Sequence, residues 1–204
     1  LFLNWDRKKA IEEITKQPKW VTGAYIVKTP NGMDKVTGVA ECISHMWKDR
    51  NYLMGVLLED AAKEEASLEK TWHLLRDYPY MGPFMAYEVV TDLRHTCLLE
   101  SATDIMTWAN AGPGAMRGLN SLTGRELDFA RRSHDWNKEM CDLYEAAATR
   151  IDYGMASIRG PHEYEMREIE GGLCEFDKYS RIFKKEGRTR SIYKHNDLPL
   201  IEDL

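Results

Sequence analysis

Apolar residues recur every three or four positions along most of the chain, which is the spacing of one face of an α-helix. One segment, Trp20–Val27, instead has strand character and is followed by a turn at residues 30–32. The pattern therefore predicts an all-α fold, to which one small β-hairpin near the N-terminus would be the only addition. The predicted helices cover Asp6–Lys16, Lys35–Asp49, Glu59–Arg76, Pro83–Leu93, Ala102–Trp108, Arg125–Asp152 and His162–Ile182.

The length and composition fit one packed domain. The chain has 204 residues, of which 43% are hydrophobic, and both values are ordinary for a single globular unit. We expect this domain to span residues 1–195 and an acidic, loosely held tail to follow at residues 196–204. The net charge of -5 excludes binders of nucleic acid that rely on overall positive charge, although a local basic patch can still contact phosphates.

The motifs of several common chemistries are missing. The four cysteines form no CxxC pair and, together with the six histidines, show no zinc spacing, so we expect reduced thiols and no metal. There is no P-loop, and we expect no cofactor. The longest apolar runs are too short to cross a bilayer. The chain begins at Leu1 rather than Met, which indicates a trimmed chain, and no export signal follows, so we expect an intracellular protein without membrane contact.

The first segment with candidate chemistry is Leu75–Arg94, whose pattern predicts a helix, a tight turn and a second helix. The second helix opens at Pro83, directly after Gly82. Free amides and the helix dipole at such an end favour an anion, and glycine lets a phosphate approach the backbone closely. Gly82 is therefore a candidate phosphate contact, and an ordinary corner between two helices is the alternative.

The second segment is Asp104–Asn120, in which Gly112 and Gly114 enclose a proline and a helix restarts behind them. Arg117 follows three residues after Gly114, where it could reach an anion held by the loop. We expect Gly112 and Gly114 to contact phosphate, to line one cleft with Gly82, and Arg117 to act on the ligand rather than on the fold. A plain helix connection with a surface arginine is the alternative.

The third segment is the basic stretch Lys178–Lys194, at the end of the last predicted helix. It holds seven Lys or Arg residues and one acid, and Tyr179, Phe183 and Tyr193 lie among them. Cations that contact phosphates and aromatic rings that stack on bases are typical of a nucleic-acid interface, and a solvated helix face is the alternative. The candidate DNA-binding residues of this stretch are Lys178, Arg181, Lys184, Lys185, Arg188 and Arg190.

Taken together, the strings YPYMGPFMAYEVVTDLRHT, TWANAGPGAMRGLN and LCEFDKYSR, with GRTR after the last and TGAYIV near the start, resemble the α-glutamyl/putrescinyl-thymine pyrophosphorylase family. That family is related to the amino acid:DNA transferases and to the helical domain attached to hydroxymethyluracil DNA kinases. The resemblance covers most of the chain. It implies a single helix-hairpin-helix DNA-glycosylase-like domain that acts in the cytoplasm of a phage-infected cell, or in the nucleus of a eukaryote.

The resemblance also implies an activity, in which an amine or amino acid replaces the pyrophosphate of a pyrophosphorylated 5-hydroxymethyluracil in DNA. DNA with modified thymine and the amine are then the partners, while the oligomeric state stays open. Two residues depart from the glycosylase pattern. Tyr80 stands where the first hairpin glycine would be, and Phe84 stands where a lyase would carry its lysine, so a Schiff-base lyase is excluded.

On this interpretation Asp104 is the base that deprotonates the amine, because it follows Gly82 by 22 positions, close to where glycosylases keep their catalytic aspartate. Asp92 is the competing carboxylate. Arg117 and the loop amides would neutralise the leaving pyrophosphate. The structural alternatives are that Asp104 caps a short helix and that Asp92 pairs locally with Arg94.

The target base must leave the duplex to reach these groups. Trp108 or Tyr87 would then stack on it, unless both rings belong to the core. Two other functions stay open. The chain is either a DNA-binding helical domain of a hydroxymethyluracil DNA kinase without catalysis of its own, or a monofunctional glycosylase for a modified base.

Overall fold

The computed structural model describes residues 4–17, 29, 32–129, 134–148 and 164–186. Within these ranges every regular element is a helix and none is a strand, which confirms the all-α class. The predicted strand Trp20–Val27 and the predicted tail at residues 196–204 lie outside the described residues. The helices are α1 (Arg7–Thr15), α2 (Lys35–Lys48), α3 (Arg50–Ala62), α4 (Leu68–Arg76), α5 (Pro83–Leu93), α6 (Pro113–Leu122), α7 (Trp136–Ala148) and α9 (Met166–Phe183).

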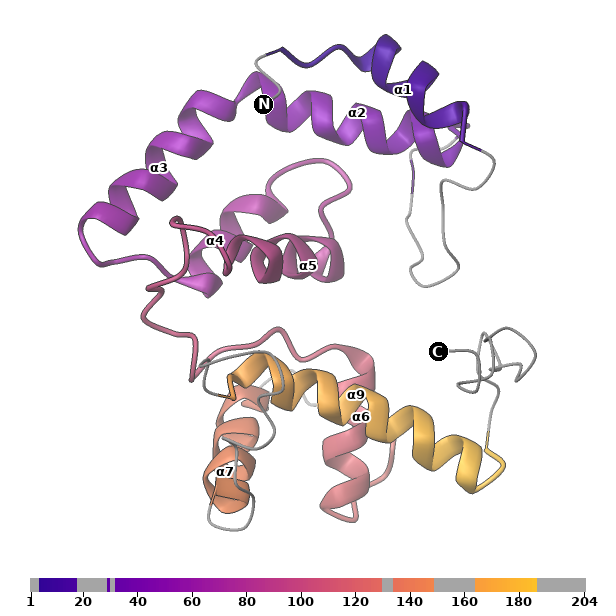
Figure 1. Cartoon of the computed structure of the whole chain (residues 1–204). Coiled ribbons are helices and arrows are strands. Elements are labelled where there is room, and N and C mark those ends of the chain that lie inside the picture. The colour runs from indigo at the N-terminus through magenta and orange to yellow at the C-terminus, as the bar shows by residue number, and fades with distance from the viewer. Residues whose placement is uncertain (1–3, 18–28, 30–31, 130–133, 149–163, 187–204) are drawn as a thin grey trace, which may run out of the picture.

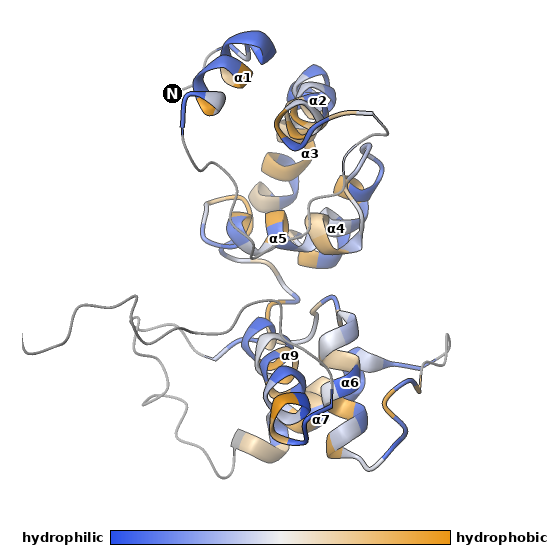
Figure 2. Ribbon diagram, turned by 90° about the vertical axis from the view of Figure 1, so that its right-hand side faces the viewer, coloured by the Kyte–Doolittle hydropathy of each residue, from blue (hydrophilic) through white to orange (hydrophobic). Residues whose placement is uncertain are grey.

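The helices form two groups that lie one above the other (Figure 1). The N-terminal helix group is α1 to α5, in which α1 packs on α2 and α4 packs on α5. The C-terminal helix group is α6, α7 and α9, and the contact between α6 and α9 is the most extensive in the structure. Figure 2 shows the same division from the side. Residues 94–112 join the two groups.

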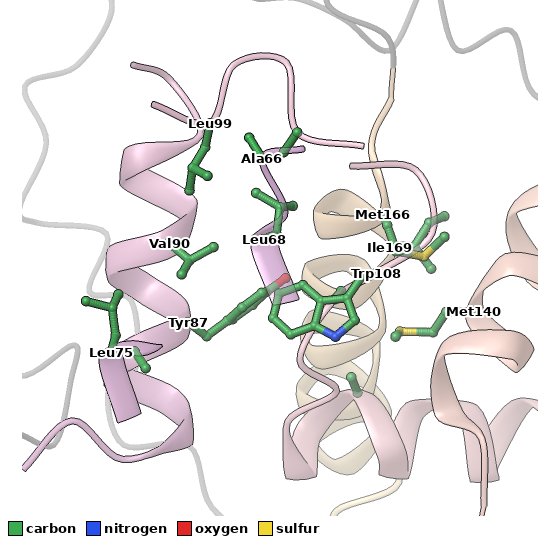
Figure 3. Packing of buried hydrophobic residues seen from close by; sticks show 14 of the residues in the cluster. Ala66, Leu68, Leu75, Tyr87, Val90, Leu99, Trp108, Met140, Met166 and Ile169 are labelled. Atoms are coloured by element: carbon green, nitrogen blue, oxygen red, sulfur yellow. The ribbon is translucent and has the colours of Figure 1, made fainter. Parts of the chain in front are cut away.

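One hydrophobic core runs through both helix groups. Leu75 and Val90 contribute to it from the N-terminal group, and Met140 contributes from the C-terminal group (Figure 3). Tyr87 and Trp108 lie where the groups meet, with ring centroids 5.7 Å apart in an edge-to-face arrangement. The buried side chains of the two groups are therefore continuous.

Four predicted helices are confirmed within a few residues, namely those that correspond to α1, α2, α5 and α9. Three others are wrong. The predicted helix Glu59–Arg76 is split into α3 and α4, because Glu64 takes a positive φ of 58° that ends one helix and Ser67 caps the next. The segment Ala102–Trp108 is a series of turns. The predicted helix Arg125–Asp152 begins only with α7.

The helix α7 begins later than predicted because the side chain of Asn120, near the end of α6, binds the segment that follows it. Asn120 is fully buried, and its Nδ2 donates to the carbonyl oxygens of Leu127 and Phe129 at 3.3 and 2.9 Å. Its Oδ1 accepts from Nε of Arg125 at 3.0 Å. These bonds hold residues 125–129 as a loop against the end of α6, since every polar atom of the buried amide finds a partner there.

Candidate nucleic-acid interface

Two glycines of α6 allow the close contact between α6 and α9. A Cβ atom on Gly114 would lie 2.6 Å from Sγ of Cys174, and one on Gly118 would lie 2.5 Å from the carbonyl oxygen of Leu173. A side chain at Gly118 would force the helices apart, because the atom it meets is backbone, and one at Gly114 would require at least that the Cys174 side chain move. The structure thus gives Gly114 a packing role in addition to its predicted place in a phosphate-binding loop.

Arg117 and Arg181 share one buried carboxylate, that of Asp177. Nε and Nη2 of Arg117 donate to Asp177 at 3.1 and 2.8 Å, and Nη2 of Arg181 lies 3.1 Å from Asp177 Oδ2. The Asp177 side chain is only 4% exposed, whereas the two arginines keep 35% and 32% of their surface. The hydrogen bonds to Asp177 raise the pKa of Arg117. The three groups therefore leave one net positive charge, presented by two partly exposed arginines.

The C-terminal end of α9 projects beyond α6 (Figure 1). This end carries exposed aromatic and basic side chains. Tyr179 and Phe183 are 66% and 75% exposed, and their rings stack with centroids 6.2 Å apart and planes at 16°. Lys184 and Lys185 follow directly and are exposed. This part of the predicted strip therefore combines a stacked aromatic pair with cations on one helix end.

The other candidate DNA-binding residues of the basic stretch have ion-pair partners or lie outside the described residues. Lys178 pairs with Glu175 one turn earlier on α9, and Arg181 belongs to the buried cluster around Asp177. Arg188 and Arg190 lie outside the described residues.

The start of α5 is open, as the predicted phosphate contact at Gly82 requires. Gly82 is the N-cap residue, no side chain caps this end, and an added Cβ would meet no atom within 4 Å. Tyr80, which stands in the place of a hairpin glycine, has a φ of 65°, in the left-handed region that favours glycine. Nδ2 of Asn110 donates to the carbonyl oxygen of Pro83 at 3.3 Å, so the Gly82 turn lies beside the loop that leads to Gly112.

The start of α6 already holds an internal carboxylate. The amide of Gly112 donates to Oε1 of Glu170 at 3.2 Å. Burial raises the pKa of Glu170, and this hydrogen bond opposes the effect only in part. A phosphate at Gly112 would therefore have to displace Glu170 or share the amide with it.

The side chain of Asp104 binds the N-terminus of α4. Leu68, at the start of this helix, precedes Asp104 by 36 residues along the chain. Its carboxylate accepts from Oγ of Ser67 at 2.7 Å and from the amides of Leu68 and Glu69 at 2.7 and 3.0 Å. A negative charge is favourable at this end of a helix. Because both oxygens are engaged, the geometry favours a structural role for Asp104, although the helix it caps is not its own.

The competing carboxylate, Asp92, is exposed on α5. Its expected local partner, Arg94, bonds elsewhere. Nη2 of Arg94 lies 2.6 Å from Oε1 of Glu165, at the start of α9, and Nη1 donates to the carbonyl oxygen of Glu100 at 3.0 Å. The alternative in which Asp92 pairs with Arg94 is therefore wrong.

The two candidate stacking rings are core residues in this structure. Trp108 and Tyr87 are 7% and 6% exposed, and Trp72 also packs against Trp108, with ring centroids 5.8 Å apart. Neither ring has a free face on which a base could stack. The hydroxyl of Tyr87 is buried and has no hydrogen-bond partner among the described residues.

Metal-binding and membrane-spanning features are absent from the described ranges. No group of three His, Cys, Asp or Glu side chains there could hold a metal ion. No helix there is both long and apolar enough to cross a bilayer. All four cysteines are free thiols. A hollow of about 280 Å³ opens between α2, α3 and the end of α4, and no predicted site residue lines it.

These features define an all-helical domain with a basic, aromatic helix end and a partly buried carboxyl group at a helix start. The family model for the helical domain of 5-hmdU DNA kinase matches residues 4–189, and the chain belongs to this family. The 5-hmdU DNA kinase of Bacillus phage SP10 is 28% identical over 138 residues, which are 64% of this chain and 21% of that protein. The match thus spans about a fifth of the relative's length. No solved structure matches the chain.

The match supports the kinase helical domain among the related families that the sequence resembles, and membership of the pyrophosphorylase family stays a prediction. Two residues of the site, Glu170 and Asp177, were not predicted as site residues. A signal for them exists, because Glu170 follows Met166 by four positions and Asp177 follows Leu173 by four. Helical spacing therefore places both acids at the core-facing stripe of α9.

Proposed function

We propose that this chain is the DNA-contacting helical domain of a 5-hmdU DNA kinase and that it binds DNA containing 5-hydroxymethyluracil. The observation that carries the proposal is the end of α9, where the exposed, stacked Tyr179 and Phe183 adjoin Lys184 and Lys185. Bases stack on such rings, and such cations neutralise phosphates. Family membership supports 5-hydroxymethyluracil as the modified base.

The test is the salt dependence of binding to an oligonucleotide that contains 5-hydroxymethyluracil, followed by fluorescence anisotropy. Lys184→Glu combined with Lys185→Glu should weaken binding at least tenfold and lower the slope of log K against log salt by about 2, one for each lost phosphate contact. Lys8→Glu with Lys9→Glu on α1 is the matched control, since it makes the same charge change at two exposed residues. An unchanged slope in the α9 variant would show that the strip is only a solvated helix face.

The second candidate function is amine transfer to the modified base, and the observation that favours it is Glu170, whose carboxylate accepts from the Gly112 amide at the start of α6 and whose pKa is raised by burial. In this reaction the amine nitrogen forms a bond to the exocyclic carbon of a pyrophosphorylated 5-hydroxymethyluracil. The carbon–oxygen bond breaks, pyrophosphate leaves with the electron pair, and a carboxylate takes the proton of the amine. Glu170 suits the role of base better than Asp104, whose oxygens cap α4, and Arg117 is occupied by Asp177.

Transfer is tested by incubating the protein with pyrophosphorylated 5-hydroxymethyluracil DNA and a mixture of amines, followed by mass spectrometry of the nucleosides. We expect Glu170→Gln to stop product formation, while Asp104→Asn and Asp92→Asn stay active. A dead Asp104→Asn with an active Glu170→Gln and an unchanged melting temperature would assign the base to Asp104. No product from the unsubstituted protein would leave DNA binding as the function.

A further inference from the structure

The exposed surface at the C-terminal end of α9 is apolar and aromatic. Four large apolar side chains lie there at helical spacing, turned away from the buried stripe of the helix, namely Phe176, Tyr179, Ile182 and Phe183. Their exposed fractions are 36%, 66%, 55% and 75%. Apart from the phenol of Tyr179, none of these side chains carries a hydrogen-bonding group. An exposed cluster of this kind typically marks an interaction surface.

Within this surface, Tyr179 and Phe183 form one aromatic platform. They stand one helical turn apart, their ring planes are inclined by only 16°, and their centroids are 6.2 Å apart. Because both residues are more than half exposed, the platform keeps ring surface free for a further planar group. A nucleobase is such a group, and proteins that bind unpaired strands obtain much of their affinity from bases stacked on aromatic rings.

Two cations follow directly after the rings. Lys184 and Lys185 are exposed, and Glu186 follows them as an exposed acid. Lys185 has a φ of 59°, in the left-handed region. Glycine takes this conformation with less strain, so a lysine here places a charge at the helix end at a cost in stability. The amide of Lys185 donates to the carbonyl oxygen of Ile182 at 3.0 Å, which closes the helix and fixes the lysines beside the rings.

The chemistry of this surface fits the faces of bases rather than their edges. In a duplex, stacking covers both faces of each base, and a protein reads the donors and acceptors that the base edges present in the grooves. The apolar side chains of the surface offer no matching groups beyond the Tyr179 hydroxyl. This helix end is also the negative end of the α9 dipole, which disfavours its insertion between two rows of phosphates. In a single strand the base faces are accessible, and the rings can stack on them.

We propose that the C-terminal end of α9 binds unpaired nucleotides, with bases stacked on Tyr179 and Phe183 and phosphates in contact with Lys184 and Lys185. The domain then holds single-stranded or locally opened DNA in preference to an intact duplex. The inference rests on the proposed function and narrows its substrate to the unpaired form of the DNA. Because every base has a ring face, the same preference is expected with thymine in place of 5-hydroxymethyluracil.

The test uses one labelled oligonucleotide as a single strand, as a duplex with its complement, and as a duplex with a central mismatched bubble, each followed by fluorescence anisotropy. The unsubstituted protein should bind the single strand and the bubble about tenfold more tightly than the duplex. Tyr179→Ala combined with Phe183→Ala should remove this preference, with little change in duplex binding, in the salt slope or in the melting temperature, because no cation and no buried contact is lost. Tyr52→Ala, at a tyrosine that is 62% exposed on α3, is the control and should keep the preference.

Two further comparisons separate stacking from other roles of this surface. Tyr179→Leu with Phe183→Leu keeps an apolar surface without rings and should bind the single strand as weakly as the alanine pair, whereas Tyr179→Phe with Phe183→Tyr should bind it normally. Lys185→Gly should weaken binding to every DNA form while the melting temperature stays equal or rises. Glu64→Gly replaces a residue with a φ of 58° at the end of α3, and it should affect stability alike without loss of binding.

Equal or tighter binding of the duplex by the unsubstituted protein would overturn the inference, and so would full binding of the single strand by the alanine or the leucine pair. Dimerisation of the unsubstituted protein that the alanine pair abolishes, without a preference for either strand form, would assign the surface to a second copy of the chain. The proposed function fails differently, because the unsubstituted protein would then bind none of the three DNA forms.

Discussion

At the scale of single residues, the place of Arg117 behind the Gly112–Gly114 loop predicts a ligand contact, yet its guanidinium forms a fork with Asp177 on α9. The geometry explains why an arginine stands there. Asp177 is buried on the core-facing side of α9, and a buried carboxylate is stable only when donors surround it. Spacing along the chain shows that Arg117 and a loop are close, but it does not show the partner 60 residues away.

Removal of Arg117 should therefore lower the stability of the fold, in addition to any effect that it has on ligand binding. Arg117→Ala leaves Asp177 with Arg181 alone, and we expect a loss of about 1–3 kcal/mol in the free energy of unfolding, discounted because a third of Arg117 is exposed. Arg117→Lys should recover only part of it, since one ammonium group cannot replace the fork. Urea denaturation measures both. Lys138→Ala, from an exposed pair on α7, is the control, and an equally small effect in Arg117→Ala would contradict the structural role.

The raised pKa of Glu170 predicts a pH dependence of stability with a defined sign. The folded chain binds the Glu170 proton more tightly than the unfolded chain does. The free energy of unfolding therefore falls as pH rises from 4.5, the ordinary pKa of a glutamate, through the higher pKa of Glu170 in the folded chain. The charges around it are Glu88, Arg167 and Lys178, beside the Gly112 amide. Glu170→Gln should flatten this slope and raise the melting temperature at neutral pH. A melting curve series on both proteins tests this, with Glu13→Gln on α1 as an exposed control.

At the scale of elements, the two most specific strings of the sequence are the two sides of one helix–helix contact. In GPGAMRGLN, Gly114 and Gly118 accept the surface of α9 and Arg117 binds its acid, while LCEFDKY supplies Leu173, Cys174 and Asp177 as their partners. The sequence shows both strings, and it shows the helices that they belong to. It cannot show that they pair, because the contact is set by tertiary packing between segments about 60 positions apart.

The same reason explains which helices the pattern located well. The predicted bounds of Pro83–Leu93 agree with those of α5, because Gly82 and Pro83 mark the start of this helix locally. The break between α3 and α4 combines the local turn at Glu64 and the Ser67 cap with Asp104, which binds the start of α4 from a distant turn. The late start of α7 depends on Asn120. The local pattern therefore locates the helix start that Gly82 and Pro83 mark, and it misses the starts of α4 and α7, to which remote side chains also contribute.

The close contact of α6 and α9 yields a prediction that a matched pair of glycines can test. Gly118→Ala would place Cβ 2.5 Å from the backbone oxygen of Leu173, which cannot rotate away, so we expect a loss of about 1–3 kcal/mol. Gly171→Ala lies on α9, where an added Cβ meets nothing within 4 Å, and it should stabilise by up to about 1 kcal/mol because alanine favours the helix. Chemical denaturation compares them. Similar effects of the two substitutions would argue against the close helix contact.

At the scale of the whole molecule, the ion pair of Arg94 with Glu165 is one of the few polar contacts that join the two helix groups within the described ranges. Its Nη2–Oε1 distance is 2.6 Å, and both side chains are 12% exposed. The amide of Met166 also donates to the carbonyl oxygen of Ile105 at 3.3 Å. These bonds fix the start of α9 against the segment that leaves α5, next to the place where Tyr87 and Trp108 continue the core from one group into the other.

Arg94→Ala is therefore expected to weaken the molecule as a whole without dividing it. It leaves Glu165 buried without its cation, which should cost about 3 kcal/mol. Because the core is continuous through Tyr87 and Trp108, unfolding should remain one transition, with the same midpoint by far-ultraviolet circular dichroism and by tryptophan fluorescence. Lys63→Ala removes an exposed pair on α3 and should shift the midpoint little. Two separate transitions in either the unsubstituted protein or Arg94→Ala would show that the helix groups are independent folding units, and the single domain expected over residues 1–195 would then be wrong.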